Sequence, residues 1–396
     1  MRQLFHIIMT ATMSLFVMYG CCTQEAPASA SNLVHAKNTL DSIFKFYGNS
    51  ENCLLTENFP HDTTYSATYL ATEDNQHGNT YSYLWPFSGI LSAVSEIIAS
   101  DPSYLSILEA KVLPGLMEYY DDARKPAAFS SYIKSAPKSD RFYDDNIWIG
   151  IDFCNLYQTT EDERFLNQAR LIWKFIESGM DAQLGGGVFW CEQNRASKHT
   201  CSNAPAAVYA LKLHLATRET HYLNQAKELY AWTRNHLLDT TDYVYFDNIN
   251  LRGEISKAKF AYNTGQMVQA AALLYQITGE NTYLQDAQKS AKACHEYFFK
   301  AISFSEGEQF RIIKPDNVWF SAVMLRGLIE LYGIDHNDTY LRDVQKSLDC
   351  AWKFARDEYG LFQRDYCGYL KDDKKWLLTQ AAMCEMYAQM SKIKIK

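Results

Sequence analysis

The chain has 396 residues and a formal net charge of −8. This acidic balance gives no basic surface of the kind that binds nucleic acid, so we expect no nucleic-acid partner. The length would allow two or more domains, although the repeat described below favours one. Aromatic residues make up 14% of the chain, and rings with polar handles suit both helix packing and sugar contact.

The N-terminal segment has the pattern of an export signal. Arg2 is followed by an apolar stretch over residues 4–19, and a small residue precedes the expected cleavage point. Met18-Tyr19-Gly20-Cys21 is similar to a bacterial lipobox, which predicts removal of residues 1–20 and a lipid on Cys21. An ordinary signal peptide, cleaved nearby, is the alternative.

Residues 21–32 are rich in Ala, Ser and Pro, and we expect them to form a flexible tether. No later apolar run is long enough to span a membrane. The sequence therefore predicts an exported protein that the lipid alone holds at the bacterial cell envelope, with its functional domain over residues 33–396.

Helical periodicity dominates the rest of the chain, and strand-like runs are few. The amphipathic segments fall into two alternating sets. The first set is the more charged, and it covers 33–48, 103–121, 161–180, 221–239, 281–301 and 339–357. The second set is apolar on more sides, and it covers 83–99, 144–159, 202–218, 262–278, 317–334 and 375–391. Together they make six helical hairpins.

A helix that is apolar on nearly all sides is buried, so the second set predicts an inner ring and the first set an outer ring. The expected fold is therefore all-α, an (α/α)6 barrel. An open solenoid of hairpins gives the same local pattern. Six pairs that close on themselves favour the barrel.

The N-terminal ends of the presumed inner helices share polar and aromatic residues. They read Tyr83-Leu84-Trp85-Pro86, Asp144-Asp145-Asn146-Ile147-Trp148, Ser202-Asn203-Ala204-Pro205, Tyr262-Asn263-Thr264-Gly265, Asp316-Asn317-Val318-Trp319 and Lys375-Trp376. Helix capping explains any single one of them. Six of them at one end of a ring would converge on one mouth, where rings and carboxylates suit a saccharide cleft.

Asp144 and Asp145 are the strongest candidates for catalysis. Retaining glycosidases hold two carboxyl groups about 5–5.5 Å apart, and adjacent Cα atoms lie about 3.8 Å apart, so neighbouring aspartates can reach that separation. Two carboxylates this close do not both ionise easily, so one pKa rises and the protonated group can donate to a leaving oxygen. The alternative is an N-cap with a favourable first-turn charge.

Other chemistry has little support in the sequence. The cysteines after Cys22 show neither a C-x-x-C motif nor a zinc spacing, and we expect no metal and no cofactor. Cys191 and Cys201 flank one loop and could pair in an exported protein. The run over residues 185–187 is Gly-Gly-Gly, which predicts a tight turn or a backbone that approaches a ligand and places Trp190 at the rim.

Four motifs resemble, in their order along the chain, the endo-α-1,6-mannanases of glycoside hydrolase family 76. They are Tyr143-Asp144-Asp145-Asn146-Ile147-Trp148, Gly185-Gly186-Gly187-Val188-Phe189-Trp190, Ser202-Asn203-Ala204-Pro205 and Tyr262-Asn263-Thr264-Gly265. The resemblance implies a retaining endo-hydrolase of the α-1,6-linked backbone of mannan, with Asp144 as nucleophile and Asp145 as acid/base. The candidates for sugar contact are Trp148, Trp190, Asn203, Tyr262 and Asn263, and for each of them packing or capping is the alternative.

Two other interpretations remain. Another (α/α)6 enzyme, such as an unsaturated-glucuronyl hydrolase or a sugar epimerase, would share the fold but use Asp residues from separate helices, or His residues. A lipid-anchored glycan-binding protein without catalysis would keep the aromatic rim and need no acid pair. Glycan transfer in place of hydrolysis is also compatible with the resemblance.

Overall fold

The computed structural model describes residues 28–62, 64–65, 67, 79–303 and 309–395. The expected signal segment and the lipid-bearing Cys21 lie outside the described residues. The boundary of the expected tether is corrected, because helix α1 already begins at Ala28. Asn32 on α1 is buried and donates a hydrogen bond to Gln345 Oε1 at 2.7 Å, so this turn belongs to the packed domain. No described helix is long and apolar enough to cross a membrane.

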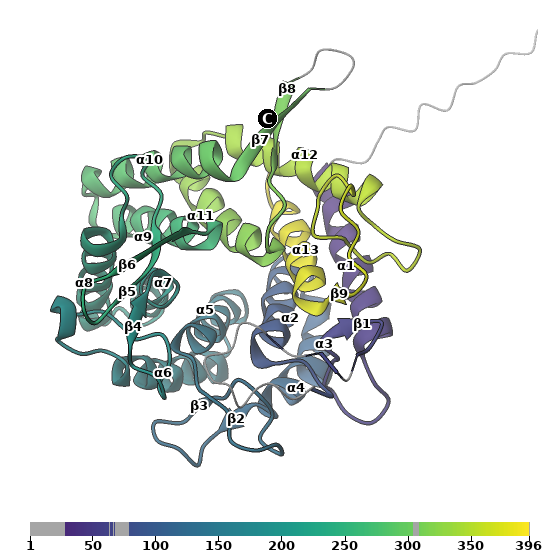
Figure 1. The fold of residues 1–396 in the computed structure, drawn as a ribbon, viewed down its shortest axis with the longest axis horizontal. Coiled ribbons are helices and arrows are strands. Elements are labelled where there is room, and N and C mark those ends of the chain that lie inside the picture. The colour runs from purple at the N-terminus through teal and green to yellow at the C-terminus, as the bar shows by residue number, and fades with distance from the viewer. Residues whose placement is uncertain (1–27, 63, 66, 68–78, 304–308, 396) are drawn as a thin grey trace, which may run out of the picture.

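Six helices form a closed inner ring (Figure 1). They are α2 (Leu84–Ile98), α5 (Tyr143–Thr160), α7 (Thr200–Thr217), α9 (Ala261–Thr278), α11 (Val318–Asp335) and α13 (Leu377–Met390). Each packs against the next along the chain, and α13 packs against α2 to close the ring. This closure confirms the (α/α)6 barrel and excludes the open solenoid.

The outer helices lie around that ring (Figure 1), and the side chains that they bury are mostly apolar. They are α1 (Ala28–Tyr47), α6 (Glu163–Ser178), α8 (Thr220–Leu237), α10 (Asn281–Phe298), α12 (Thr339–Phe354) and a broken segment over residues 102–117. The helices α6, α8 and α10 each pack against the inner helix that precedes them, and α1 packs against α13. Chain ends that are far apart in sequence therefore lie side by side.

The second outer segment is not the continuous helix that we expected over residues 103–121. It consists of a 3₁₀ turn (η2, Pro102–Tyr104), a short α-helix (α3, Leu105–Ile107), a π-helical turn (η3, Leu108–Val112) and a last α-helical turn (α4, Leu113–Met117). Pro114 has no backbone N–H and its ring crowds the preceding turn. The π-helical turn ends two residues before this proline, and prolines and π-bulges are the usual places where a helix is interrupted.

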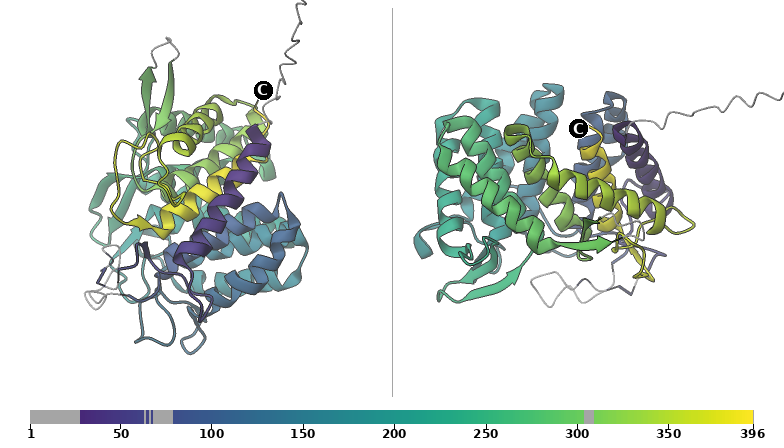
Figure 2. Two further views of the ribbon diagram at one scale, coloured as in Figure 1. Left: turned by 90° about the vertical axis from the view of Figure 1, so that its right-hand side faces the viewer. Right: turned by 90° about the horizontal axis from the view of Figure 1, so that it is seen from above.

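Short strands lie at one end of the barrel, between each outer helix and the inner helix that follows it (Figure 2). They are β1 (Asn58–Phe59), β2 (Tyr120–Asp121), β3 (Ala128–Phe129), β4 (Ser197–His199), β5 (Phe246–Asn250), β6 (Ile255–Lys259), β7 (Phe299–Ser303), β8 (Gln309–Ile313) and β9 (Lys375–Trp376). The antiparallel pairing of β1 with β9 joins the first and last hairpins. We call this strand-bearing end the upper end, since it carries the N-termini of the inner helices.

The lower end has much shorter connections. Four inner helices end there in a single left-handed residue whose backbone N–H caps the last turn: Glu161, Arg218, Gly279 and His336. One residue of this kind reverses the chain within a few positions. The long loops, and with them most of the side chains that can form a site, are therefore left at the upper end.

One anchoring contact repeats around the upper end. The fourth residue of four inner helices bonds the backbone of the segment that comes before the helix, and these residues are Asn146, Asn203, Thr264 and Gln380. Asn146, for example, accepts from the N–H of Phe129 at 2.8 Å and donates to the carbonyl of the same residue at 2.9 Å. The contact fixes each loop against the helix that follows it.

Candidate active site

A cavity of about 470 Å³ opens at the upper end of the barrel, over the N-termini of the inner helices. Its walls are mostly aromatic, and Asp144 and Asp145 project into it. The lining residues are Tyr83, Trp85, Ser131, Phe142, Asp144, Asp145, Trp148, Trp190, His199, Cys201, Asp247, Phe260, Tyr262, Trp319 and Phe320. Five of the six inner-helix ends therefore meet at this mouth as expected, whereas Lys375-Trp376 before α13 does not line it.

The two aspartates occupy the first turn of α5 without capping it. The N-cap residue is Phe142, whose side chain has no hydrogen-bonding group. The start of α5 is held by the N–H of Tyr143, which donates to the carbonyl of Trp190 at 2.9 Å. Because the helix does not need either carboxylate as a cap, both are left to face the cavity.

Asp144 is surrounded by hydrogen-bond donors. Its Oδ2 accepts from Trp190 Nε1 at 3.0 Å and from the Cys201 thiol at 3.2 Å, and its Oδ1 accepts from the backbone N–H of Asp145 at 3.0 Å. Burial raises the pKa of Asp144 to about 6, although these donors favour the ionised form and pull the pKa down. The group is therefore an anion near neutral pH, held in a fixed orientation.

Asp145 has a different environment. Its side chain accepts no hydrogen bond from the part of the chain that the structure describes, so little offsets its desolvation. Burial and then the adjacent Asp144 raise the pKa of Asp145 well above its ordinary value. One proton is thus shared unequally between the two groups, with Asp145 as the protonated member and Asp144 as the ionised one.

The aromatic walls come from helices that are far apart in sequence. Tyr262 on α9 stacks on Phe320 on α11, with ring centroids 4.2 Å apart and an interplanar angle of 16°. Trp148 meets Trp319 edge to face at 4.9 Å, and Trp85 meets the same indole at 5.5 Å. The rings hold one another in the lining that also carries the two carboxyl groups, an arrangement that suits the carbon face of a sugar ring.

Three of the five expected sugar-contact residues line this cavity, namely Trp148, Trp190 and Tyr262. Asn203 does not. It is fully buried, and its amide accepts from the N–H of Val188 at 2.6 Å and donates to the carbonyls of Val188 and His199. Both the oxygen and the nitrogen of the amide are hydrogen-bonded to the backbone, so Asn203 positions the loop that carries Trp190. The prediction that Asn203 contacts the sugar is therefore corrected.

Asn263 is also buried and lies behind the wall of the cavity. Its Nδ2 lies 3.4 Å from Asp247 Oδ1, and its own Oδ1 has no hydrogen-bond partner among the described residues. Asn263 therefore reaches the site through Asp247.

Asp247, His199 and Cys201 are lining residues that the sequence did not reveal as site residues. Asp247 comes from β5, burial raises its pKa, and Asn248 Nδ2 donates to it at 2.8 Å. His199 stacks on Trp190 at 4.8 Å, and burial lowers its pKa to about 3, which keeps the ring neutral. No sequence motif marks these positions, because strand–helix packing brings them to the mouth.

The glycine run forms the predicted tight turn, with φ of +78°, +129° and +85° at Gly185, Gly186 and Gly187. The turn does not line the cavity. A Cβ at Gly187 would lie 2.9 Å from the Trp232 ring, so Gly187 allows close packing against that ring. The approach of this backbone to a ligand, the other interpretation, is not seen.

The pairing of Cys191 with Cys201 is not found, since both are free thiols. No cluster of three His, Cys, Asp or Glu residues able to hold a metal occurs within the described ranges.

A barrel of helical hairpins with paired carboxyl groups in an aromatic cavity defines a protein of the glycosidase class. Residues 35–394 match the model of Glycosyl hydrolase family 76, and the chain belongs to that family. This finding confirms the family resemblance noted in the sequence.

Solved structures and curated proteins agree with this assignment. A family 76 glycoside hydrolase from a bovine Bacteroides thetaiotaomicron strain is 34% identical, with a TM-score of 0.81 over 91% of this chain and 78% of that chain. A family 76 mannosidase from Bacteroides thetaiotaomicron VPI-5482 is 32% identical, with a TM-score of 0.81 over 91% and 98% of the two chains. The mannan endo-1,6-alpha-mannosidase DCW1 of Candida glabrata is 26% identical over 129 residues, which are 30% of this chain and 29% of that protein.

Proposed function

We propose that this protein is a retaining, endo-acting glycosidase that hydrolyses α-1,6-mannosidic linkages in the backbone of mannan. The observation that carries the proposal is the unequal pair in one cavity, a hydrogen-bonded Asp144 beside an Asp145 that accepts no hydrogen bond from the described residues and whose pKa is raised by burial. Membership of family 76 and similarity to a protein named as a mannan endo-1,6-alpha-mannosidase support the choice of substrate.

In the first step, ionised Asp144 attacks the anomeric carbon and displaces the glycosidic oxygen. Asp145 donates its proton to that oxygen, so the leaving sugar departs as a neutral alcohol. The product on the protein is a β-mannosyl ester of Asp144. The donors from Trp190 and Cys201 fix the attacking carboxylate, and the aromatic walls exclude water from the reacting atoms.

In the second step, Asp145 is ionised and accepts a proton from a water molecule. That water attacks the anomeric carbon, the ester bond breaks, and Asp144 leaves as a carboxylate. Two inversions restore the α configuration. A sugar hydroxyl in place of water would give transglycosylation by the same step.

The testing experiment is digestion of debranched α-1,6-mannan, with products followed by size over time and the anomer of the first product read by NMR. A ladder of oligosaccharides that appears first as the α anomer is the expected result. Mannose alone would move the proposal to an exo-enzyme, and a first β product would exclude retention. Glycan binding without any product would favour the non-catalytic glycan-binding protein.

Export and lipidation at Cys21 are part of the proposal, and they rest on the similarity of residues 18–21 to a lipobox. In a bacterial host, we expect the protein to partition with membranes and the Cys21→Ser variant to be found in the soluble fraction. Equal membrane association of both proteins would remove the anchor from the proposal.

A further inference from the structure

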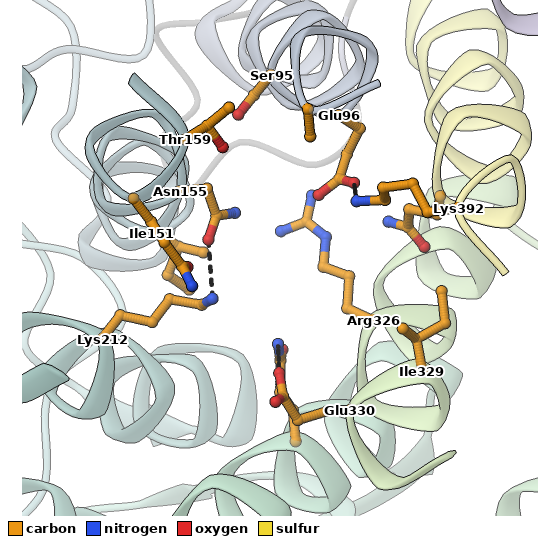
Figure 3. A pocket seen from close by; sticks show the side chains of 14 residues that line it. Ser95, Glu96, Ile151, Asn155, Thr159, Lys212, Arg326, Ile329, Glu330 and Lys392 are labelled. Carbon is orange, nitrogen blue, oxygen red and sulfur yellow. Dashed lines mark hydrogen bonds and ion pairs between the residues drawn. The ribbon is translucent and has the colours of Figure 1, made fainter. Parts of the chain in front are cut away.

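A second cavity, of about 410 Å³, opens at the lower end of the barrel. All six inner helices contribute to it, from their middle and C-terminal turns. Asn155 and Thr159 of α5 line it, whereas Asp144 and Asp145 at the other end of the same helix line the upper cavity. Figure 3 shows the side chains of α2, α5, α7 and α11 converging on one central space. The two cavities are therefore separate sites at opposite ends of the barrel.

Arg326 is the central side chain of this lower cavity and extends from α11 into its middle (Figure 3). The side chain is only 7% exposed. Its Nε donates to Glu385 Oε1 at 2.7 Å, but Nη1 and Nη2 have no hydrogen-bond partner among the described residues. A buried donor without an acceptor costs stability, so these two nitrogens indicate space for a polar molecule.

Unpartnered acceptors lie close to these donors. Gln389 also lines the cavity, and its Nε2 donates to Glu385 Oε1 at 2.5 Å, while its Oε1 is buried without a partner in the part of the chain that the structure describes. Glu385 Oε2 is in the same condition. An anion could satisfy only the arginine, whereas a hydroxyl group both donates and accepts. Unpartnered groups of both kinds therefore favour a hydroxyl-bearing ligand.

The charges around the lower cavity also disfavour an anion. Lys392 pairs with Glu96, and Arg326 pairs with Glu385. Lys212 donates to the neutral Asn155 at 2.8 Å, and Glu330, an acid in the same lining, accepts from glutamine amides. Any anion near Arg326 would also face the carboxyl groups of Glu385, Asp152 and Glu96. A neutral polar ligand meets no such repulsion.

We propose that the lower cavity is a second carbohydrate site, which binds one neutral hexose through hydroxyl groups that bridge Arg326 and Gln389. Ile151 and Ile329 on its walls offer apolar contact for the carbons of the ring. The volume lies within the range of small-molecule sites, and the exposed rim residue Thr159 marks the opening. The proposal goes beyond the hydrolysis of mannan and does not depend on it.

The test is titration of the protein with D-mannose by calorimetry, in the native chain and in Thr159→Trp. The bulky indole at an exposed rim position covers the opening without disturbing the core. Thr339→Trp is the matched control, because Thr339 is also exposed but lies on α12 and lines neither cavity. Gln389→Leu removes the unpartnered acceptor at similar volume, which is expected to weaken the lower site about tenfold.

We expect Thr159→Trp to lose a saturable mannose site that Thr339→Trp keeps, while its rate on mannan equals that of the native protein. The proposal is overturned if native protein shows no saturable mannose binding, or if Thr159→Trp binds mannose as the native chain does. It is equally overturned if inorganic phosphate binds and is the only ligand that Thr159→Trp excludes. Native protein without mannanase activity would sink the proposed function and leave this test unaffected.

Discussion

The two ends of the barrel are built from the same inner helices and have opposite chemistry. The upper end holds carboxyl groups among aromatic rings, while the lower end holds lysines and an arginine among carboxylates and amides. Helix polarity accounts for part of this difference, because helix N-termini favour acidic groups and C-termini favour basic ones. The remainder follows from the connections, which are long at the upper end and short at the lower end.

Charge is also managed differently at the two ends. At the lower end Glu96 and Glu385 each have a basic partner. At the upper end no lysine or arginine among the described residues lines the cavity, and Asp145 stays protonated beside the ionised Asp144. Two adjacent acidic groups without a basic partner in the described part of the chain are electrostatically unfavourable at the upper end, whereas at the lower end each of the two acids is stabilised by a basic partner. The comparison predicts that substitutions at the upper cavity have their largest effect on turnover, and that substitutions of the paired charges at the lower cavity have their largest effect on stability.

The largest expected effect is on turnover at the upper end. We expect Asp144→Asn and Asp145→Asn each to reduce the rate on mannan by about 10³-fold or more, since each removes a group that forms or breaks a bond. Asp122→Asn is the matched control, because Asp122 is an exposed aspartate outside both cavities. Circular dichroism checks that the variants are folded. Near-native turnover in either cavity variant contradicts the assignment.

The second effect is on stability at the lower end. Arg326→Met leaves the buried Glu385 without its charged partner, which is expected to lower the free energy of unfolding by about 3–5 kcal/mol. Lys392→Met breaks the more exposed pair with Glu96 and is expected to cost less than about 1 kcal/mol. Chemical denaturation measures both values. The comparison of the two ends fails if Arg326→Met is as stable as the native chain, or if its folded form has lost turnover.

A third test uses the pH dependence of stability. The folded-state pKa values of Asp144 and Asp145 lie above those of the unfolded chain, so the folded state binds more protons between the two. Their contribution is thus fully present below about pH 4, the unfolded value, and is lost as the pH rises through about 6 and beyond. We expect the Asp144→Asn Asp145→Asn variant to melt above the native protein at neutral pH. Thermal unfolding across this range measures the difference in melting temperature between the variant and the native protein, which should close near pH 4. A difference that does not depend on pH would contradict the raised pKa values of the two aspartates.

Most of the fold was predictable from the sequence, because the inner helices are apolar on nearly all sides and such helices are buried. Residues 206–211 are all buried, as their unbroken apolar run predicted. The prediction of one continuous helix over residues 103–121 was wrong. The spacing of the apolar residues there is helical, but Pro114 lacks the backbone N–H that a regular helix needs. The start of the domain was placed late, since the residues before 33 are small and polar but pack through Asn32.

The catalytic pair was accessible from the sequence because both members are adjacent. Asp247 was not, because it reaches the cavity from a strand and has no neighbouring motif. Asn203 was misassigned for a different reason. An asparagine near a helix start can turn its amide into the mouth or back to its own loop, and the choice depends on the backbone of Val188, which only the folded chain supplies.

The smallest expected effect concerns Cys201, the thiol that donates to Asp144. A hydrogen bond to the ionised form lowers a pKa, so Cys201→Ala should raise the pKa of Asp144 and move the acidic limb of the rate profile to higher pH. A thiol is a weak donor, and we expect a displacement of about half a unit. Cys201→Ser keeps a donor and should restore the native limb, which separates hydrogen bonding from loss of packing. Profiles measured for kcat decide the matter, because a purely structural thiol would lower the rate equally at every pH.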